Sequence, residues 1–449
     1  MDELYEKQDR EIREIFKKSL QAMSPYELVE EQIQVKEGDQ RVVTICGQSN
    51  ELTPNQNIWV FGTGKAAPQM ASALEHKLGD RIKDGIVICP YGTRTKTRYI
   101  QQFEASHPLP DHDSESATYE LLNLARKVPP GDLVIYALTG GTSALLCLPA
   151  DDLELDELRK TYELLLKSGA DIHEFNTVRK HLSKVKGGQL LYYLKDVRLV
   201  DLVISDVVDD DLESIGSGPT TPDSTTFEDA FQVLKRYRIW EDVPHAVRKH
   251  LAKGMHAEIP DTPKPGSDFL VQHKTHIIGS AQKLAERTAG QAKKMGYNVW
   301  VDDSPYSGDV RKTSKRLSEK AISVLKENDP AEKPAALIFY GESTVQVKGN
   351  GKGGRNQELA LAAALSIEGQ HHITLLSAGT DGRDGPTDAA GAVINAETAL
   401  KARKDNIEPE DYLQNNDSYH FFEKINSLLK TGPTGNNLMD LQIILIDKS

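Results

Sequence analysis

The sequence predicts an α/β fold made of two domains, and three observations support this prediction. Short apolar runs rich in β-branched residues alternate with helical patterns, which is typical of buried parallel strands connected by helices. At 449 residues, the chain is longer than one ordinary domain. The segment 260–274 combines proline, glycine and charged residues, as expected of a linker or crossover between two folded parts.

The first domain is expected over residues 1–260 as a doubly wound parallel sheet. Its predicted strands are the apolar runs 58–61, 85–89, 133–137 and 202–204. Helical patterns separate them, for example from Ala66 to Leu78 and from Leu155 to Lys167, where Gly169 is expected to end the helix. A charged helical pattern from Glu3 to Leu20 is interpreted as a surface helix packed on this domain.

The second domain is expected over residues 275–449 as another α/β unit. Its predicted strands lie near Ile277 and Val299 and at 336–340, 372–376 and 441–446. The run 344–347 is predicted to form a hairpin with the strand 336–340, which would make this sheet mixed.

Composition argues against several classes of protein. The 67 acidic and 54 basic residues give a formal charge of -13, which disfavours a nucleic-acid partner. No run of about eighteen apolar residues occurs and the first residues are polar, so we expect no membrane span, no signal peptide and a cytoplasmic location. Cys46, Cys89 and Cys147 are widely spaced and odd in number, so reduced thiols are expected rather than disulfides or a zinc site.

The glycine-rich segment 349–354 precedes a helical pattern, with Arg355 at the junction. Glycine lets the backbone bend and approach an anion closely, and the start of a helix adds free N–H groups. The segment therefore predicts a phosphate or carboxylate site with Arg355 as its cation. Its candidate binding residues are Gly351, Gly353, Gly354, Asn356 and Glu358.

A second glycine loop, from Gly62 to Ala67, follows the first predicted strand. It places Lys65 beside Gly62 and Gly64, and it is either a phosphate-binding loop or a strand–helix turn with a solvated lysine. Both glycine loops match the spacing of a dinucleotide fingerprint. Neither is followed by the acidic residue that such a site needs at the end of the next strand, so a nicotinamide cofactor is disfavoured.

Three further groups of polar residues follow predicted strands or lie on a predicted helix. Gly140, Gly141 and Ser143 are predicted to form a second anion cradle. Arg179 and Lys180 lie in the helical pattern 171–186, either as cations that stabilise the helix end or as substrate-binding residues. Carboxylates that suit Mg²⁺ bound together with phosphate occur at 206–211 and 381–388, and they include Asp206, Asp381 and Asp388. Any single aspartate of this kind is more often a turn residue or a solvated charge, but two such clusters beside anion loops favour a metal–phosphate site.

Taken in order, these loops resemble the glycerate kinases of the glycerate 2-kinase (MOFRL) family. The matching stretches are 62–67, 106–111, 140–141, 176–183, 205–207, 217–220, 353–358, 378–391 and 431–435. The resemblance runs from about residue 10 to the end of the chain. Two positions depart from the family's pattern, because Thr142 and Asp209 stand where the family usually has glycine.

The resemblance implies ATP-dependent phosphorylation of D-glycerate, usually at the 2-hydroxyl. It implies a site in the cleft between a Rossmann-like N-terminal domain and a C-terminal α/β domain, with Lys65 and Arg355 as the catalytic cations. We expect Mg²⁺ to be held through Asp381 or Asp388 and the nucleotide.

On the same hypothesis, Asp206 orients or deprotonates the glycerate hydroxyl. The glycerate carboxylate is held by N–H groups near Ser143 or by Arg179. Two alternatives remain open: an NAD(P)H-dependent hydroxypyruvate reductase, and a non-catalytic binder of sugar phosphates or organic anions. The sequence leaves the oligomeric state undecided, with a homodimer as one option.

Overall fold

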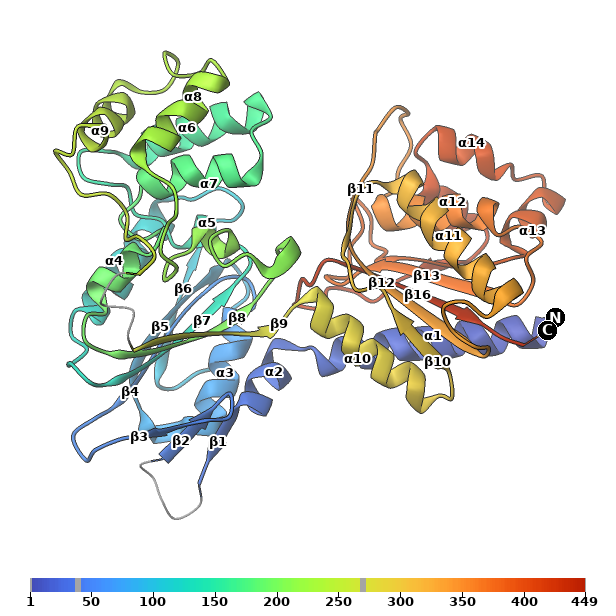
Figure 1. Cartoon of the computed structure of the whole chain (residues 1–449), viewed down its shortest axis with the longest axis horizontal. Helices are drawn as coiled ribbons and strands as arrows, with labels where there is room; N and C mark the ends of the chain where they lie inside the picture. The colour runs from blue at the N-terminus through green and yellow to red at the C-terminus, as the bar shows by residue number, and fades with distance from the viewer. Residues whose placement is uncertain (1, 37–41, 267–271, 449) are drawn as a thin grey trace. The chain divides into compact units, whose positions relative to one another are not determined.

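The computed structural model describes residues 2–36, 42–266 and 272–448, and the chain divides into two compact units (Figure 1). One unit is Pro25–Ile278, and the other combines Met1–Ser24 with Gly279–Ser449. Among the described residues, no helix combines the length and apolar character needed to cross a membrane.

The unit Pro25–Ile278 is built around a six-stranded sheet with the order β6-β5-β4-β7-β8-β9. The strands are β4 (Ile58–Thr63), β5 (Ile82–Pro90), β6 (Ile100–Ala105), β7 (Leu133–Thr139), β8 (Arg198–Ile204) and β9 (His273–Gly279). Neighbouring strands from β6 to β8 are parallel, which confirms the predicted doubly wound sheet. The chain leaves β4 towards β5 on one side and returns to β7 on the other. In such folds, ligands bind at the carboxyl ends of the strands where this reversal occurs.

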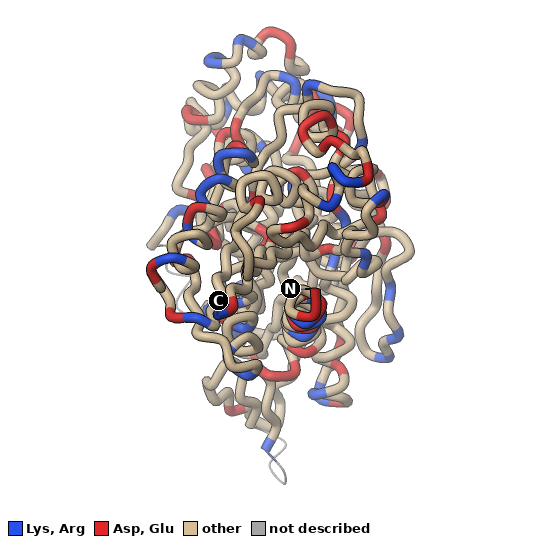
Figure 2. Tube along the Cα trace, turned by 90° about the vertical axis from the view of Figure 1, so that its right-hand side faces the viewer, with Lys and Arg blue, Asp and Glu red and all other residues tan. Residues whose placement is uncertain are grey.

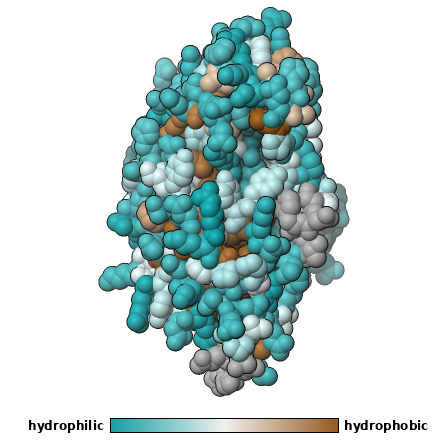
Figure 3. Space-filling view, turned by 90° about the vertical axis from the view of Figure 1, so that its left-hand side faces the viewer, coloured by the Kyte–Doolittle hydropathy of each residue, from teal (hydrophilic) through white to brown (hydrophobic). Residues whose placement is uncertain are grey.

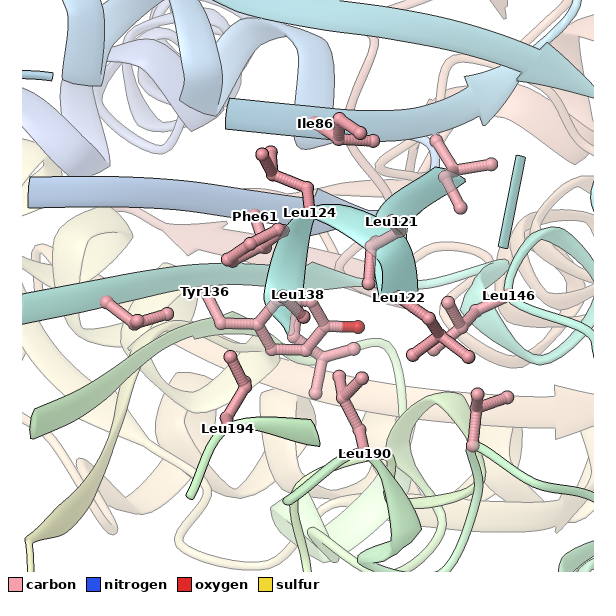
Figure 4. Close-up of a cluster of buried hydrophobic side chains, with 14 of the residues drawn as sticks. Phe61, Ile86, Leu121, Leu122, Leu124, Tyr136, Leu138, Leu146, Leu190 and Leu194 are labelled. Atoms are coloured by element: carbon pink, nitrogen blue, oxygen red, sulfur yellow. The ribbon is translucent and has the colours of Figure 1, made fainter. Parts of the chain in front are cut away.

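Helices surround this sheet and also form a cluster of their own. They are α2 (Pro25–Gln32), α3 (Ala67–Leu78), α4 (His112–Ala125), α5 (Thr142–Leu145), α6 (Leu155–Ser168), α7 (Ile172–His181), α8 (Phe227–Arg236) and α9 (His245–Met255). Aromatic strand residues such as Phe61 and Tyr136 pack against Leu121 of α4 and Leu190 (Figure 4). Gly169 ends α6 in the left-handed conformation, as predicted. A small antiparallel sheet contains β1 (Ile33–Val35), β2 (Val42–Ile45) and β3 (Gln48–Glu51).

The other unit contains a seven-stranded sheet with the order β10-β12-β16-β13-β14-β15, and β11 also pairs with β12. The strands are β10 (Asn298–Val301), β11 (Tyr306–Asp309), β12 (Ala335–Thr344), β13 (Ile373–Gly379), β14 (Gly391–Asn395), β15 (Leu428–Leu429) and β16 (Asp440–Ile446). Because β12 is parallel to β10 and antiparallel to β16, the predicted mixed sheet is confirmed. The helices are α1 (Asp2–Ala22), α10 (Ala281–Lys294), α11 (Val310–Glu327), α12 (Arg355–Ser366), α13 (Thr398–Lys404), α14 (Pro409–Gln414) and α15 (Ser418–Lys424).

The surface carries charges of both signs. Lysine and arginine are interspersed with aspartate and glutamate along the trace in Figure 2. The face in Figure 3 is mostly hydrophilic, with small separate hydrophobic areas. Along the described residues, acidic positions thus interrupt the basic ones.

The N-terminal helix was expected on the first domain, and this expectation is wrong. Helix α1 packs against α10, β13 and β16, all of which belong to the unit Gly279–Ser449. Its buried face includes Ile12, Ile15 and Phe16, and Gln8 accepts a hydrogen bond from Thr374 on β13 at 2.8 Å. An amphipathic pattern indicates that a helix has a buried face but not which sheet covers it.

Two predicted strand assignments are also wrong. The strand near Ile277 is β9, which joins the first sheet; His273 Nε2 lies 2.7 Å from the buried Asp201 Oδ2 on β8. The run 344–347 forms no hairpin, because β12 continues to Thr344 and the chain then turns towards Asn416. Both corrections come from partners far away in the sequence.

The helical pattern 171–186 ends earlier than expected. Helix α7 stops at His181, and the Lys184 N–H then donates to the Leu148 carbonyl oxygen at 3.0 Å. Residues 182–186 therefore leave the helix axis, and the side chain of Lys186 becomes fully buried.

Candidate active site

Two loops meet where the strand order of the first sheet reverses. The first follows β4 and carries Gly62, Gly64 and Lys65, and the second follows β7 and carries Gly140. The Lys65 N–H donates to the Gly140 carbonyl oxygen at 2.9 Å, so the loops are joined directly. Gly64 has a φ of 123°, and a methyl group there would lie 2.1 Å from Thr139 Oγ1, so the position requires glycine. Lys65 thus lies at the carboxyl ends of β4 and β7.

Ionisable side chains surround the loop after β7. A methyl group at Gly140 would lie 2.0 Å from Asp206 Oδ2, and one at Gly141 would lie 3.2 Å from both Lys65 Cγ and His107 Cδ2. Burial, together with the charge of Lys65, lowers the pKa of His107 to about 4, so its imidazole is neutral at neutral pH. The ends of several strands therefore bring a carboxylate, an imidazole and an ammonium to one place.

Lys65 is the cation of this group that remains accessible. Its side chain is exposed and makes no hydrogen bond or ion pair with any residue in the described ranges. An ammonium that no protein carboxylate neutralises is available to an anionic ligand.

A hydrogen-bonded cluster continues from the same loop towards α7. Ser143 Oγ lies 2.9 Å from Ser217 Oγ, and Ser217 Oγ donates to Asn176 Oδ1 at 3.0 Å. Arg179 Nη1 donates to both Ser217 Oγ and Asn176 Oδ1 at 3.3 Å. The Arg179 guanidinium also lies 4.1 Å from the centre of the Phe175 ring. The structure therefore brings the predicted residues Ser143 and Arg179 together.

Lys180 has a different environment from its neighbour Arg179. Its Nζ donates to Glu213 Oε2 at 2.9 Å and to Asp223 Oδ1 at 3.2 Å, and the residue is buried. A buried ammonium between two carboxylates is already neutralised by the protein. This environment favours the structural interpretation of Lys180 over the substrate-binding one.

Lys186 was not singled out by the sequence analysis. Its Nζ donates to the Ser143 carbonyl oxygen at 2.9 Å and to the Leu146 carbonyl oxygen at 2.6 Å, and the side chain is fully buried. Burial lowers the pKa of Lys186 to about 8. The one local signal for this position is that Lys186 comes directly before the glycine pair 187–188.

In the other unit, the glycine-rich segment 349–354 lines a cavity of about 790 Å³. The volume lies within the range of small-molecule and cofactor sites, about 300–1,000 Å³. The cavity brings together several predicted residues with others from β12 and the loop after β13. It is lined by Ser343, Thr344, Val345, Val347, Gly351, Gly353, Gly354, Arg355, Glu358, Asp381, Arg383, Asp384, Gly385, Pro386 and Asn416.

Arg355 at the wall of this cavity is held by two carboxylates. Its Nε and Nη2 donate to the two carboxylate oxygens of Asp440 at 2.6 and 3.0 Å, and Nη1 donates to Glu342. Burial lowers the pKa of Arg355, but Asp440 and Glu342 more than offset this and hold it above its usual value. Burial raises the pKa of Asp440 to about 7, against the opposing effect of Arg355. Arg355 is therefore a permanently charged and firmly positioned cation.

The start of helix α12 differs from the expectation of free N–H groups. The buried Asp384 carboxylate accepts from the Asn356 N–H at 3.0 Å and from the Gln357 N–H at 2.8 Å. An acidic side chain at this position satisfies the helix terminus and its dipole. The anion at these two N–H groups is thus the chain's own Asp384 carboxylate. The sequence hypothesis of an external anion at these N–H groups is therefore corrected.

Two other predicted binding residues also have partners within the protein. Asn356 Oδ1 accepts from Ser377 Oγ at 2.8 Å and from Gln442 Nε2 at 3.1 Å. The Glu358 carboxylate accepts from Asn416 Nδ2 at 2.8 Å and from Arg311 Nε at 3.2 Å. Both side chains are buried, and their contacts fix α12 and the loop before it.

The two candidate metal ligands, Asp381 and Asp388, have different surroundings. Asp381 lines the cavity, and its Oδ1 accepts from the Arg383 N–H at 3.0 Å. Asp388 does not line it; the Asp388 carboxylate accepts from Tyr419 at 2.8 Å and from Lys430 at 2.9 Å. Within the described parts of the chain, no group of three or more His, Cys, Asp or Glu side chains is arranged to hold a metal ion. Of these two candidates, only Asp381 lines the cavity, and one carboxylate suits a magnesium ion that takes most of its ligands from water and phosphates.

Comparison with known proteins shows the family of the chain. Residues 11–252 match a family model described as "Domain of unknown function (DUF4147)", and residues 335–440 match the MOFRL family. The chain is 40% identical to D-glycerate 2-kinase of Thermotoga maritima, over 96% of this chain and 97% of that protein. The chain belongs to the glycerate 2-kinase (MOFRL) family.

Other members of the glycerate 2-kinase family are similar over nearly the whole chain. Glycerate 2-kinase of Pyrococcus horikoshii is 38% identical over 95% of each chain. The crystal structure of glycerate kinase from Thermotoga maritima superimposes with a TM-score of 0.87 at 39% identity, covering 98% of this chain and 100% of that chain. The resemblance inferred from the ordered motifs is thus confirmed.

The two departures from the pattern of the glycerate 2-kinase family have structural explanations. Thr142 is buried, and its Oγ1 donates to the Thr139 carbonyl oxygen at 2.7 Å and to the Thr63 carbonyl oxygen at 2.9 Å. It therefore links the ends of β4 and β7. Asp209 has a φ of 61°, in the left-handed region that glycine adopts most easily. Lys65 and Arg355 belong to different units, so their joint action stays a prediction.

Proposed function

We propose that this protein transfers the γ-phosphoryl group of ATP to the 2-hydroxyl of D-glycerate, giving 2-phosphoglycerate and ADP. The observation that carries the proposal is the exposed Lys65 ammonium, which lies beside Gly141 at the strand-order reversal while Asp206 packs against Gly140. Cations and a positioned acceptor are what phosphoryl transfer requires from a protein. The names of the full-length relatives support the substrate.

In this proposal, the first unit binds the acceptor. The Asp206 carboxylate orients the glycerate 2-hydroxyl and accepts its proton as the oxygen forms a bond to the γ-phosphorus. Lys65 stabilises the negative charge on the transferred phosphoryl group, and the bond to the β-phosphate oxygen breaks to release ADP. His107, neutral at neutral pH, adds no competing positive charge beside Lys65.

The second unit binds the nucleotide phosphates in the cavity beside Gly351, Gly353 and Gly354. Arg355 supplies the second cation for the transferred group, and its two carboxylate partners fix its guanidinium plane. Asp381 is the residue we propose as a magnesium ligand, with Asp388 as the less favoured one because Lys430 and Tyr419 occupy its oxygens. A magnesium ion held there would supply positive charge that neutralises the nucleotide phosphates.

The direct test is to incubate the protein with D-glycerate, ATP and Mg²⁺ and to identify the product by phosphorus NMR. We expect 2-phosphoglycerate and ADP in equal amounts. Formation of 3-phosphoglycerate would contradict the assigned hydroxyl. A parallel reaction with hydroxypyruvate and NAD(P)H tests the reductase alternative, which predicts NAD(P)H oxidation. Binding of D-glycerate without any turnover would instead favour a non-catalytic binder.

A further inference from the structure

Arg179 and Lys186, near Ser143, differ from the other basic residues of the segment 179–186. Lys180 forms ion pairs with Glu213 and Asp223, His181 Nε2 lies 3.0 Å from Asp261 Oδ1, and Lys184 pairs with Asp151. Arg179 and Lys186 form no ion pair with any carboxylate in the part of the chain that the structure describes. Of the basic residues in this segment, the two without a carboxylate partner among the described residues are thus the two whose hydrogen bonds lead to Ser143 in the loop after β7.

Ser143 connects the two cations. On one side, Lys186 Nζ donates to the Ser143 carbonyl oxygen at 2.9 Å. On the other side, Ser143 Oγ lies 2.9 Å from Ser217 Oγ, which accepts from Arg179 Nη1 at 3.3 Å. Lys186 is completely buried, whereas Arg179 and Ser143 are only partly buried. A ligand can therefore reach Arg179 and Ser143, with Lys186 behind them.

The hydrogen-bond donors in this cluster exceed the acceptors. Arg179 Nε and Asn176 Nδ2 are both buried and have no hydrogen-bond acceptor among the residues that the structure describes. Burial lowers the pKa of both Arg179 and Lys186, and the charge of Arg179 lowers that of Lys186 further. Buried charges are normally paired, and unpaired buried donors are unfavourable. A small anion with several acceptor oxygens would supply both the missing negative charge and the missing hydrogen-bond acceptors.

We propose that this cluster is the subsite for the carboxylate of a small 2-hydroxycarboxylate, in which Arg179 and Ser143 contact the carboxylate and Lys186 is a positioning residue. Lys186 fixes Ser143 through its carbonyl oxygen and adds positive charge from behind. Asn176 and Ser217 orient the Arg179 guanidinium. The identification of the ligand as D-glycerate rests on the proposed function.

The loop itself relates the two ends of the substrate. Gly140, against which Asp206 packs, is three residues before Ser143 in the same short turn. A carboxylate at Ser143 would therefore leave the adjacent hydroxyl on the side of Asp206. This arrangement explains why an acceptor with the hydroxyl next to its carboxylate would be selected.

The test measures binding of D-glycerate without ATP by isothermal titration calorimetry, and compares it with binding of the neutral amide glyceramide. We expect Lys186→Met to raise the Kd for D-glycerate by about tenfold or more and to change the Kd for glyceramide much less. The Kd for ATP should stay within about twofold of the unmodified protein, because Lys186 does not act on the phosphates. If Lys186 had a purely structural role, Lys186→Met would raise the Kd values for D-glycerate and glyceramide alike.

Lys184→Met is the matched control, because Lys184 is a partly exposed lysine of the same segment whose ammonium pairs with Asp151. We expect this variant to bind D-glycerate and glyceramide as the unmodified protein does. An equal loss of charge selectivity in Lys184→Met and Lys186→Met would mean that general electrostatics, rather than the subsite, determines binding.

A pH series on the unmodified protein tests the same inference without a substitution. Burial places the pKa of Lys186 at about 8, and the groups that face its ammonium are Arg179 and the thiol of Cys147, whose own pKa burial raises. D-Glycerate binding should therefore weaken as the pH rises through about 8, while glyceramide binding stays flat and Lys186→Met abolishes the pH effect.

Two results would overturn the proposal: a D-glycerate to glyceramide ratio unchanged in Lys186→Met, or an affinity for D-glycerate in the unmodified protein that does not change between about pH 7 and 10. If the same preparations still phosphorylate D-glycerate, the proposed function survives this outcome. Conversely, charge-selective carboxylate binding without phosphoglycerate formation would support the subsite and reject the proposed reaction.

Discussion

Lys65 and Arg355 share an expected role as catalytic cations, but their surroundings differ. Lys65 is exposed and has no partner among the described residues, whereas Arg355 binds Asp440 and Glu342. Because the Lys65 ammonium has no such partner, replacing Lys65 should change the free energy of unfolding little. Removal of Arg355 leaves a buried carboxylate without its counter-ion. The same chemical role therefore has different consequences for stability at the two positions.

We expect Lys65→Met to lower kcat by about 10²-fold or more, the usual effect of losing one charge-stabilising donor, with an unchanged thermal midpoint. Arg355→Met should lower kcat to a similar extent and also reduce the free energy of unfolding by roughly 3 kcal/mol. Steady-state kinetics and chemical denaturation check both expectations. Adding Asp440→Asn to Arg355→Met should restore part of the stability and none of the activity. Near-normal turnover in Lys65→Met would reject its catalytic role.

At the scale of elements, helix α12 depends on a partner from another strand end. Asp384 follows β13, and its carboxylate accepts from the first N–H groups of α12. The glycine-rich segment before α12 is held in turn by the backbone and side chains of Asn415 and Asn416. The segment is thus shaped by the protein before any ligand binds.

Asp384→Ala should lower the free energy of unfolding by about 1–2 kcal/mol, because it removes the acceptor that caps α12. It should also raise the KM for ATP, since the cavity loses the group that positions the start of the helix. Asp384→Asn keeps one acceptor oxygen, so its free energy of unfolding and its KM for ATP should lie between those of the unmodified protein and those of Asp384→Ala. An unchanged KM for ATP in Asp384→Ala would argue against nucleotide binding in this cavity.

For the molecule as a whole, the candidate residues divide between the two units. Lys65, Ser143 and Arg179 belong to the unit Pro25–Ile278, and Arg355 and Asp381 belong to the other. Each ligand should therefore leave its own pattern of protection from hydrogen exchange, because a bound ligand suppresses local opening around its site.

We expect D-glycerate alone to slow amide exchange at 140–146 and 176–186, and ATP with Mg²⁺ to slow it at 349–358 and 381–386. Hydrogen exchange followed by mass spectrometry measures both patterns in the full chain. Glycerol serves as the control ligand without a carboxylate and should protect neither region. Protection of 62–67 by ATP, with none at 349–358, would move the nucleotide site to the first unit.

The sequence by itself determined the class of the fold, the positions of most strands and the glycine-rich loops in which we propose ligand-binding groups. Apolar alternation, glycine-rich turns and capping residues act over a few neighbouring positions, so they can be recognised without coordinates. The same local signals placed Lys65 and Arg355 next to glycine loops. The order of the motifs was sufficient to recognise the family.

The tertiary structure alone decided which charges are already neutralised. Arg355 and Asp440 lie 85 positions apart in the chain, and Asn356 and Asp384 lie 28 apart. Lys180 pairs with Asp223, whereas Lys186 has only carbonyl partners among the described residues, and no pattern in the neighbouring sequence predicts this difference. Packing between distant segments likewise decided that β9 joins the first sheet and that α1 packs against the second. Contacts of this kind depend on how distant segments pack, which local patterns do not encode.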